Sequence, residues 1–251
     1  EAAHADFGHF KVNETSPQAV VIGDLGEAWD FTRLNDSFRH IMEGAEFVLY
    51  CLSDDAAVSA VVMDAGGVLE SATSEMTVID LSTIGLEAAK EAARTLAGAG
   101  ITYIDAPVSG GQTGAKAGTI TVMWAGPKDV LDTHRKVMES FSKNLFHVGP
   151  NPGQGQAMKL LNNFLSGTAM VATSEAMAFG LSQGLVMETM LDVGNVSTGR
   201  NSATSDKFPN RIATGTYDAG FKTALLTKDV QLFLDNAKIA GTPVDVAEAV
   251  V

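Results

Sequence analysis

Two lysines stand among apolar residues in stretches with a helical pattern. Lys159 lies in the run 153–184, and Asn163 follows it by four residues, so both side chains share one helical face. Lys228 lies in a second apolar run, 221–230, which is predicted to be a helix with Phe221, Leu225 and Lys228 on one face. Burial lowers the pKa of an ammonium group towards neutrality, where the group can donate or accept a proton. The pattern favours acid–base chemistry at Lys159, although a single helical lysine more commonly extends its charge to solvent.

The turn Ser109-Gly110-Gly111 could bind an anion. It follows a predicted strand over residues 101–105. A hydroxyl and consecutive backbone N–H groups, with no side chains in the way, form a concavity that suits a carboxylate or a phosphate. The same three residue types are common in ordinary turns. Both interpretations stay open from the turn alone.

The elements that must position these groups alternate between strands and helices from residue 46 onwards. Apolar runs of strand length are followed by helix-starting residues and then by helical patterns. This order predicts a mainly parallel sheet covered by helices on both faces, with ligands beyond the carboxyl ends of its strands. The predicted strands are 47–52, 77–81 and 101–105, the helices are 56–63 and 86–97, and the strand ends are Leu52-Ser53, Ser82-Thr83 and 106–111.

The second half of the chain is predicted to be helical. An antiparallel strand over 119–124, a surface helix over 128–141 and a final segment over 146–150 complete the sheet domain. The run 153–184 has no proline, which predicts one unbroken helix of about seven to eight turns. Its apolar residues point in nearly every direction, which predicts burial all round. Prolines and glycines near residue 150 divide the chain into an α/β domain, 1–150, and an all-helical domain, 151–251.

The composition narrows the possible partners. The 251 residues carry 30 acidic and 17 basic side chains, a net charge of −13. The longest basic run has three residues, 134–136, so we expect neither nucleic acid nor a membrane surface as a partner. A single cysteine, Cys51, excludes an internal disulfide and suits a cytoplasmic location. Apolar runs stay shorter than the 18 residues typical of a membrane span.

The first residues allow two interpretations. A short strand over 10–12 leads into Asn13-Glu14-Thr15, and an acidic residue after the second strand of a dinucleotide-binding fold binds the adenosine ribose. Ser16-Pro17 is equally typical of a helix start. The glycines at 23 and 26 are spaced G-x-x-G rather than G-x-G-x-x-G, so this run is not predicted to be a phosphate loop. Residues 27–45 have a polar helical pattern.

Three motifs together resemble those of the β-hydroxyacid dehydrogenase family, over about residue 44 to the end and more loosely over 8–17. They are Asp105-Ala-Pro-Val-Ser-Gly-Gly111, Gly153-x-Gly-x-x-x-Lys159-x-x-x-Asn163 and Phe221-(x)6-Lys228-Asp229. The resemblance implies an oxidoreductase that transfers a hydride between a nicotinamide cofactor and a small β-hydroxy acid, or that reduces the corresponding semialdehyde. It also implies a Rossmann-like α/β domain with a mainly parallel sheet, followed by an all-α domain and joined to it by a long helix.

The resemblance assigns roles by position. Lys159 matches the catalytic lysine of the family, and Asn163 matches an amide that holds the substrate and the lysine. Hydride leaves a carbon as its hydroxyl loses a proton, so a base must sit at that oxygen with an anion site beside it. Ser109, Gly110 and Gly111 match the turn that binds the substrate carboxylate, Leu52, Ser53 and Thr83 match cofactor positions, and Phe221 and Lys228 match the nicotinamide-side wall.

The resemblance also bears on the cofactor and on assembly. A carboxylate at Glu14 would accept hydrogen bonds from the ribose hydroxyls and repel a 2′-phosphate, which favours NAD over NADP; Asn13 is the other residue that could make this contact. Subunits of the family pair through the helical domain, so we expect a homodimer or a homotetramer. The family's G-x-G-x-x-G is absent, residues 18–43 match poorly, and residue 251 falls inside a helix. We expect the sequence to be part of a longer protein.

Three alternatives share this scaffold. Decarboxylating phosphogluconate dehydrogenases follow their lysine with a His-Asn pair, whereas residues 160–163 here are Leu-Leu-Asn-Asn. Imine reductases usually replace the lysine. A non-catalytic interaction module would have no need of Lys159, Asn163 and the Ser-Gly-Gly turn together.

Overall fold

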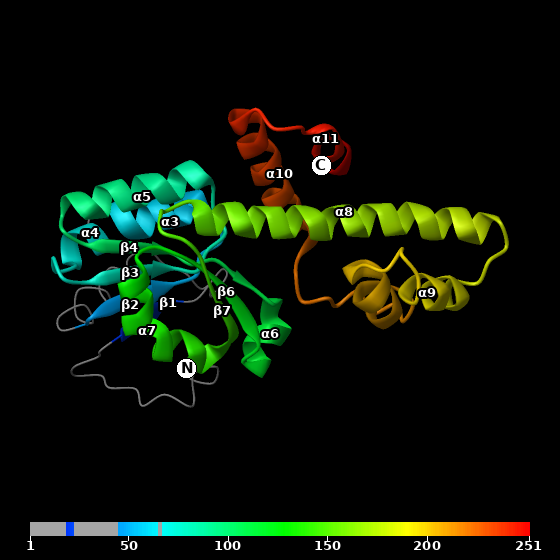
Figure 1. Ribbon diagram of the computed structural model, residues 1–251, viewed down its shortest axis with the longest axis horizontal. Coiled ribbons are helices and arrows are strands. Elements are labelled where there is room, and N and C mark those ends of the chain that lie inside the picture. The colour runs from blue at the N-terminus through cyan, green and yellow to red at the C-terminus, as the bar shows by residue number, and fades with distance from the viewer. Residues whose placement is uncertain (1–18, 23–44, 65–66) are drawn as a thin grey trace. The chain divides into compact units, whose positions relative to one another are not determined.

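The computed structural model describes residues 19–22, 45–64 and 67–251 (Figure 1). Asn13, Glu14, the predicted strand at 10–12, the glycines at 23 and 26, and nearly all of the stretch 27–45 lie outside the described residues. The chain divides into two compact units, Glu1–Lys159 and Leu160–Val251, and the division falls within helix α8 (Gln154–Ser182).

The first unit is built on one sheet, which has seven strands among the described residues, in the order β1-β2-β3-β4-β6-β5, with β7 also paired to β6. The first four pair in parallel, and β6 runs antiparallel to β4 and β5 but parallel to β7. The bounds are β1 Ala19–Ile22, β2 Phe47–Tyr50, β3 Thr77–Asp80, β4 Thr102–Asp105, β5 Val108–Ser109, β6 Ile120–Ala125 and β7 Ser142–Gly149. The sequence pattern left β1 unassigned, and the structure shows it as the edge strand beside β2.

Helices cover both faces of this sheet, as the sequence predicts (Figure 1). Successive strand residues point to opposite faces, so Val48 and Tyr50 pack against α3 (Asp55–Met63), α4 (Val68–Ser71) and α5 (Leu86–Gly98). Phe47 and Leu49 contribute to the opposite core, which is closed by Leu131 and Met138 of α7 (Lys128–Phe141). The observed bounds of α7 coincide with the predicted ones. A short helix, α6 (Gly111–Ala117), follows the Ser-Gly-Gly turn.

All regular secondary structure of the second unit is helical, as predicted. After α8 come α9 (Met187–Asn195), the π-helix η2 (Ala203–Ile212), α10 (Thr223–Ala240) and α11 (Asp245–Val250). Met177, Leu191, Ala203 and Phe208 form a core that joins α8, α9 and η2.

Two predictions about these helices are wrong. The 29 residues of α8 are one unbroken helix, but it is not buried all round, because Leu161, Leu165 and Phe179 are 46%, 59% and 68% exposed. An apolar pattern indicates which helix surfaces favour burial, but it does not say what buries them. These three apolar side chains of α8 stay exposed in this chain. Phe221 does not share a helical face with Leu225 and Lys228, because it precedes α10, which begins after the extended residue Lys222.

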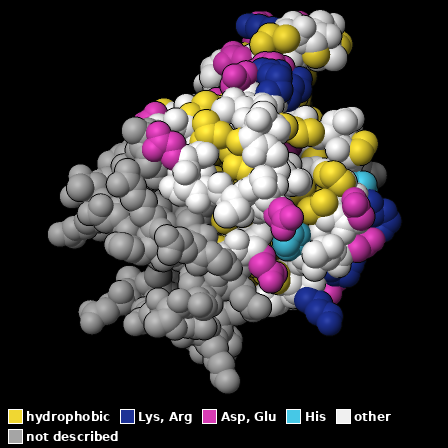
Figure 2. Space-filling model, turned by 90° about the vertical axis from the view of Figure 1, so that its left-hand side faces the viewer, with side chains coloured by type: hydrophobic (Ala, Val, Ile, Leu, Met, Phe, Trp, Pro, Cys, Tyr) yellow, Lys and Arg dark blue, Asp and Glu magenta, His cyan; other side chains and the backbone are white. Residues whose placement is uncertain are grey.

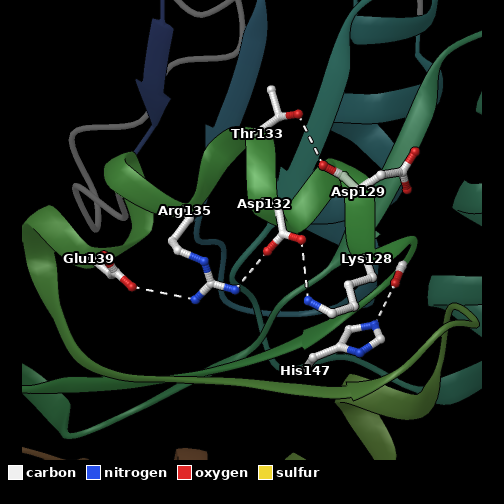
Figure 3. A network of polar contacts seen from close by, with 8 residues as sticks. Lys128, Asp129, Asp132, Thr133, Arg135, Glu139 and His147 are labelled. Carbon is white, nitrogen blue, oxygen red and sulfur yellow. Dashed lines mark hydrogen bonds and ion pairs between the residues drawn. The ribbon is translucent and has the colours of Figure 1, made fainter.

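The surface carries ion pairs between neighbouring turns of helices. On α7, Asp132 lies 3.2 Å from Lys128 and 2.9 Å from Arg135, which also lies 3.4 Å from Glu139 (Figure 3). Such exposed pairs add little to stability, because water and salt screen the attraction between their charges. Basic side chains on the face drawn in Figure 2 are likewise scattered among acidic ones. His147 lies with its Nε2 2.8 Å from the Gly126 carbonyl oxygen (Figure 3), a contact that ties β7 to the end of β6.

Candidate active site

The carboxyl ends of the parallel strands carry two buried carboxylates. The register pairs Asp80 of β3 with Asp105 of β4, and both side chains are fully buried. Burial raises the pKa of Asp80 to about 6, although hydrogen bonds from Ser82 and Tyr103 oppose the rise. Burial likewise raises the pKa of Asp105 to about 7; hydrogen bonds from Gln156 oppose this rise, whereas the charge of Asp80 adds to it. Asp80 and Asp105 are therefore two members of a buried hydrogen-bond network that also includes Ser82, Tyr103 and Gln156.

This network aligns the ends of β2 and β3, where the sequence predicts cofactor contacts. The Ser82 backbone N–H donates to Asp80 Oδ1 at 2.8 Å, and the Leu52 N–H donates to Ser82 Oγ at 2.8 Å. Thr83 is partly exposed, whereas the other residues of the run 81–85 are buried. Ser53 is exposed, and its hydroxyl donates to the Asp54 carboxylate at 2.8 Å. The structure therefore brings Leu52, Ser53 and Thr83 to one edge of the sheet.

The start of α8 is attached to the same edge by Asp105. Its Oδ2 accepts from the Gly153 N–H at 2.8 Å and from the Gln156 N–H at 3.1 Å, so a strand residue caps the helix. Gly153 has φ +90°, a conformation that favours glycine. A Cβ on Gly155 would lie 2.8 Å from the Asp105 carbonyl oxygen, so only glycine permits this approach. One turn further along the helix, Lys159 is 7% exposed.

Both glycines of the Ser-Gly-Gly turn have backbone conformations that other residues rarely adopt. Ser109 is half-buried at the end of β5, where it pairs with Thr121 of β6. Gly110 and Gly111 follow with φ +136° and +58°, and both are exposed. Two consecutive glycines with positive φ turn the chain sharply and leave its backbone open on one side.

In the second unit, Asn163 is held by a residue that sequence reasoning missed. The Asn163 Nδ2 donates to Asp229 Oδ2 at 2.6 Å, and Lys228 Nζ lies 3.1 Å from Asp229 Oδ1. Asn163 and Asp229 are 5% and 2% exposed. A buried carboxylate between an amide and an ammonium fixes the orientation of both. The signal available in the sequence was the acidic residue next to Lys228 in the third motif.

The remaining site predictions have less structural support. Phe221 is 43% exposed and lies before α10, and Asn13 and Glu14 fall outside the described residues. Within the part of the chain that the structure describes, no three His, Cys, Asp or Glu side chains gather as metal ligands would. No helix in that same part is both long enough and apolar enough to cross a membrane.

Two family models match the chain in succession. The model for the NAD binding domain of 6-phosphogluconate dehydrogenase matches residues 11–149. The model described as NAD-binding of NADP-dependent 3-hydroxyisobutyrate dehydrogenase matches residues 153–251. The two matches meet at the run of prolines and glycines near residue 150.

Individual proteins agree with these matches. The chain is 36% identical over 245 residues to a Pseudomonas aeruginosa 3-hydroxyisobutyrate dehydrogenase, which covers 94% of this chain and 80% of the relative. It is 33% identical over 212 residues to an NAD-dependent L-serine dehydrogenase of the same organism, covering 82% of this chain and 71% of the relative.

A solved structure is similar over nearly the whole chain. The Mycobacterium tuberculosis 3-hydroxyisobutyrate dehydrogenase with L-serine superposes with a TM-score of 0.79 at 25% identity, covering 93% of this chain and 91% of the other. With the family models and the curated relatives, this similarity confirms the resemblance seen in the motifs. The chain belongs to the β-hydroxyacid dehydrogenase family, and it is an NAD(P)-linked hydroxyacid oxidoreductase.

Proposed function

We propose that Lys159 is the acid–base group of this oxidoreductase and that Ser109, Gly110 and Gly111 bind the carboxylate of its substrate. The observation that carries the proposal is the burial of Lys159, 7% exposed, one turn beyond the point where Asp105 attaches α8 to the strand ends. Burial of an ammonium group costs free energy, so a buried lysine on the helix that begins at the strand ends is a candidate for an acid–base role. Helix α8, which Asp105 attaches to the strand ends, carries Lys159 close to the edge of the sheet where ligands bind in such folds.

The strand ends suit the nicotinamide half of the cofactor. The hydrogen bond between the Leu52 N–H and Ser82 Oγ aligns two strand ends, and Ser53 and Thr83 are the hydroxyl residues that remain partly or fully exposed there. Hydroxyl and backbone groups are the partners that ribose hydroxyls and a carboxamide require. The bound cofactor supplies the hydride acceptor.

The chain's own residues then handle the proton. Lys159 accepts the proton of the substrate hydroxyl as hydride leaves the carbon, and in the reverse direction its ammonium stabilises the developing alkoxide before donating. Asn163, oriented by its 2.6 Å bond to Asp229, holds the substrate oxygen or the lysine in place. The backbone at Gly110 and Gly111 binds the carboxylate without a side chain in the way.

We propose a substrate with a primary hydroxyl one carbon removed from the carbon that bears the carboxylate. The relatives named for 3-hydroxyisobutyrate and L-serine support this class, since both compounds have that arrangement. The carboxylate would anchor the substrate at the Ser-Gly-Gly turn and place the hydroxyl carbon for hydride transfer.

We propose NAD as the preferred cofactor because Glu14 would accept bonds from the adenosine ribose and repel a 2′-phosphate. At close range, even a screened pair of like charges costs on the order of 1 kcal/mol or more. One relative is named as NAD-dependent, whereas the family model over 153–251 is named for an NADP-dependent enzyme, so the proposal depends on Glu14.

Self-association and location are also proposals. The exposed apolar residues Leu161, Leu165 and Phe179 of α8 support a homodimer or homotetramer formed through the helical unit. Light scattering on the purified protein tests this. A cytoplasmic location rests on the single cysteine, and fractionation of cells tests it. Nucleic acid and membrane remain unexpected partners because of the net charge of −13.

Substitution of Lys159 by alanine tests the acid–base role. Removal of a general acid–base typically costs about 10²- to 10⁴-fold, so kcat of the full-length protein should fall by roughly that factor while cofactor Kd stays within about twofold. Lys136→Ala, at an exposed position of α7, is the matched control. Near wild-type kcat in Lys159→Ala would refute the role. Turnover of cyclic imines but not of hydroxy acids would favour an imine reductase, and cofactor binding without any turnover would favour an interaction module.

A further inference from the structure

The Gln156 side chain is completely buried, and its amide joins two strand ends. Its Nε2 donates to the Ser82 carbonyl oxygen at 3.0 Å and to Asp105 Oδ1 at 2.7 Å. Its Oε1 accepts from the Ile84 N–H at 3.0 Å. Both amide hydrogens and the amide oxygen therefore have partners. The carbonyl oxygen of Ser82 can only accept and the N–H of Ile84 can only donate, so the amide fits in one orientation.

Two of these bonds enclose Thr83. The Ser82 carbonyl and the Ile84 N–H lie immediately before and after that residue, and both bond to the same amide. The pairing resembles that of a neighbouring strand, because a primary amide offers one donor and one acceptor side by side. Thr83 itself is the partly exposed residue of the run 81–85. The backbone that presents Thr83 is therefore held by Gln156.

The same residue is attached to the lysine by the helix. Gln156 precedes Lys159 by three residues, less than one turn of α8. Its own N–H donates to Asp105 Oδ2 at 3.1 Å. Main chain and side chain of one residue thus connect β4, the turn after β3 and the helix that carries Lys159.

We propose that Gln156 is a positioning residue that sets the separation between the Thr83 turn and Lys159. The inference rests on the proposed function, in which Thr83 contacts the cofactor and Lys159 is the acid–base group. Hydride transfer needs both partners within a few tenths of an ångström of the reactive geometry, and a misplacement of 1 Å can cost about 100-fold in rate. Gln156 is hydrogen-bonded to the turn that contains Thr83 and lies in the same helix as Lys159, so it directly controls the distance between them.

A packing role alone would not require glutamine. A fully buried amide costs free energy unless all its hydrogen bonds form, whereas methionine or leucine would fill the same volume without that requirement. The polar choice brings directionality, because hydrogen bonds define the angle as well as the distance between the elements that they join.

The test is the substitution Gln156→Met, which keeps the length of the side chain and removes its hydrogen bonds. In the full-length protein we expect kcat to fall by roughly 10- to 100-fold and the Kd of NADH, measured by nicotinamide fluorescence, to rise severalfold. Gln154→Met, at an exposed position two residues earlier, is the matched control and should change neither quantity by more than about twofold. Unchanged kcat and Kd in a folded Gln156→Met would overturn the proposal.

A double-mutant cycle with Lys159→Ala separates positioning from general loss of structure. If Gln156 acts through the lysine, its effect on kcat should largely disappear once Lys159 is alanine, so the double variant should match Lys159→Ala within about twofold. Independent, multiplicative losses would overturn the proposal. If Gln156→Met does not fold, as judged by circular dichroism, Gln156→Asn serves the same cycle, because its amide is one methylene too short to reach these partners.

The outcomes also distinguish this inference from the proposed function. Activity retained in Lys159→Ala refutes the role of the lysine, and with it the positioning of that lysine by Gln156. Activity lost in Lys159→Ala but retained in Gln156→Met refutes only the positioning role.

Discussion

A methyl group added at Gly155 should displace the helix that carries Lys159. The Cβ of Gly155→Ala would lie 2.8 Å from the Asp105 carbonyl oxygen and 2.9 Å from that of Met123. Both atoms belong to the backbone of strands within the sheet, so neither can rotate away. Relief of these contacts requires a movement of roughly 0.5 Å or more, since ordinary carbon contacts begin near 3.5 Å.

The magnitude follows from overpacking. Insertion of a methyl group into a well-packed site typically costs about 1–3 kcal/mol, offset by the roughly 0.5–1 kcal/mol that alanine gains over glycine in a helix. The free energy of unfolding of Gly155→Ala should therefore fall by up to about 2.5 kcal/mol. If the helix moves by about half an ångström, kcat should fall by roughly tenfold, in proportion to the 100-fold cost of a 1 Å misplacement.

The matched control is Gly98→Ala, at the last residue of α5, where an added Cβ has no atom within 4 Å. Urea unfolding and steady-state kinetics on both variants check the prediction. Gly98→Ala should be as stable as the wild type or slightly more stable, with unchanged kcat. A Gly155→Ala variant with the stability and kcat of Gly98→Ala would refute the reasoning, because it would show that α8 does not need its close approach to β4.

Further predictions concern the pH dependence of stability, the contact between Asn163 and Asp229, the choice of cofactor and the Ser-Gly-Gly turn. Burial raises the pKa of Asp80 to about 6 and that of Asp105 to about 7, so protonation of either carboxyl group favours the folded state. The stability that this protonation contributes is fully present below about pH 4 and is lost as the pH rises through 6–7. The free energy of unfolding should thus increase from pH 8 to pH 5, and Asp80→Asn should show a smaller increase; an identical increase in the variant would contradict this. Asp229→Ala leaves Asn163 without its 2.6 Å partner and should lower kcat/KM by roughly 10-fold or more, whereas an unchanged value in steady-state assays would separate Asp229 from the site. Glu14→Arg should shift the ratio of kcat/KM for NAD over NADP towards NADP by about 10-fold or more, and a wild-type enzyme that prefers NADP would exclude the proposed role of Glu14. Gly110→Val should raise KM for hydroxy acids sharply. Because φ +136° strains any side chain at that position, Gly118→Val, at φ +63° with no atom within 4 Å of the added Cβ, is the control for strain. An equal KM in the two variants would show that the turn is not part of the site.

Local patterns predicted the elements of the first unit well. The bounds of α7 agree at both ends, and β2, β3 and β4 lie within the predicted strands. These elements depend on alternation of apolar residues, on caps such as Asp54 and on glycines that end helices, all of which are short-range properties. The strand β1 was missed because a run of four apolar residues is too short for its pattern to distinguish a strand from other structure.

The site was predicted as a set of residues and not as an arrangement. Lys159, Asn163 and the Ser-Gly-Gly turn could be chosen from their residue types and from motif order. The hydrogen-bonding roles of Asp80, Ser82 and Gln156 could not be predicted, because an aspartate, a serine or a glutamine in an apolar stretch gives no sign of its partner. The bond between Gln156 and Ser82 joins residues 74 positions apart.

The sequence by itself determined where most helices and strands of the sheet domain begin and end, that one helix continues from the sheet domain into the helical one, and which residues resemble a family's catalytic machinery. Only the tertiary structure decided that Asp105 caps α8, that Gly155 allows its approach and that Gln156 joins the Thr83 turn to the helix of Lys159. It also decided that one side of α8 stays exposed. The physical reason is range: periodicity and capping act over a few residues, whereas burial and hydrogen-bond partners depend on segments that meet only when the chain folds.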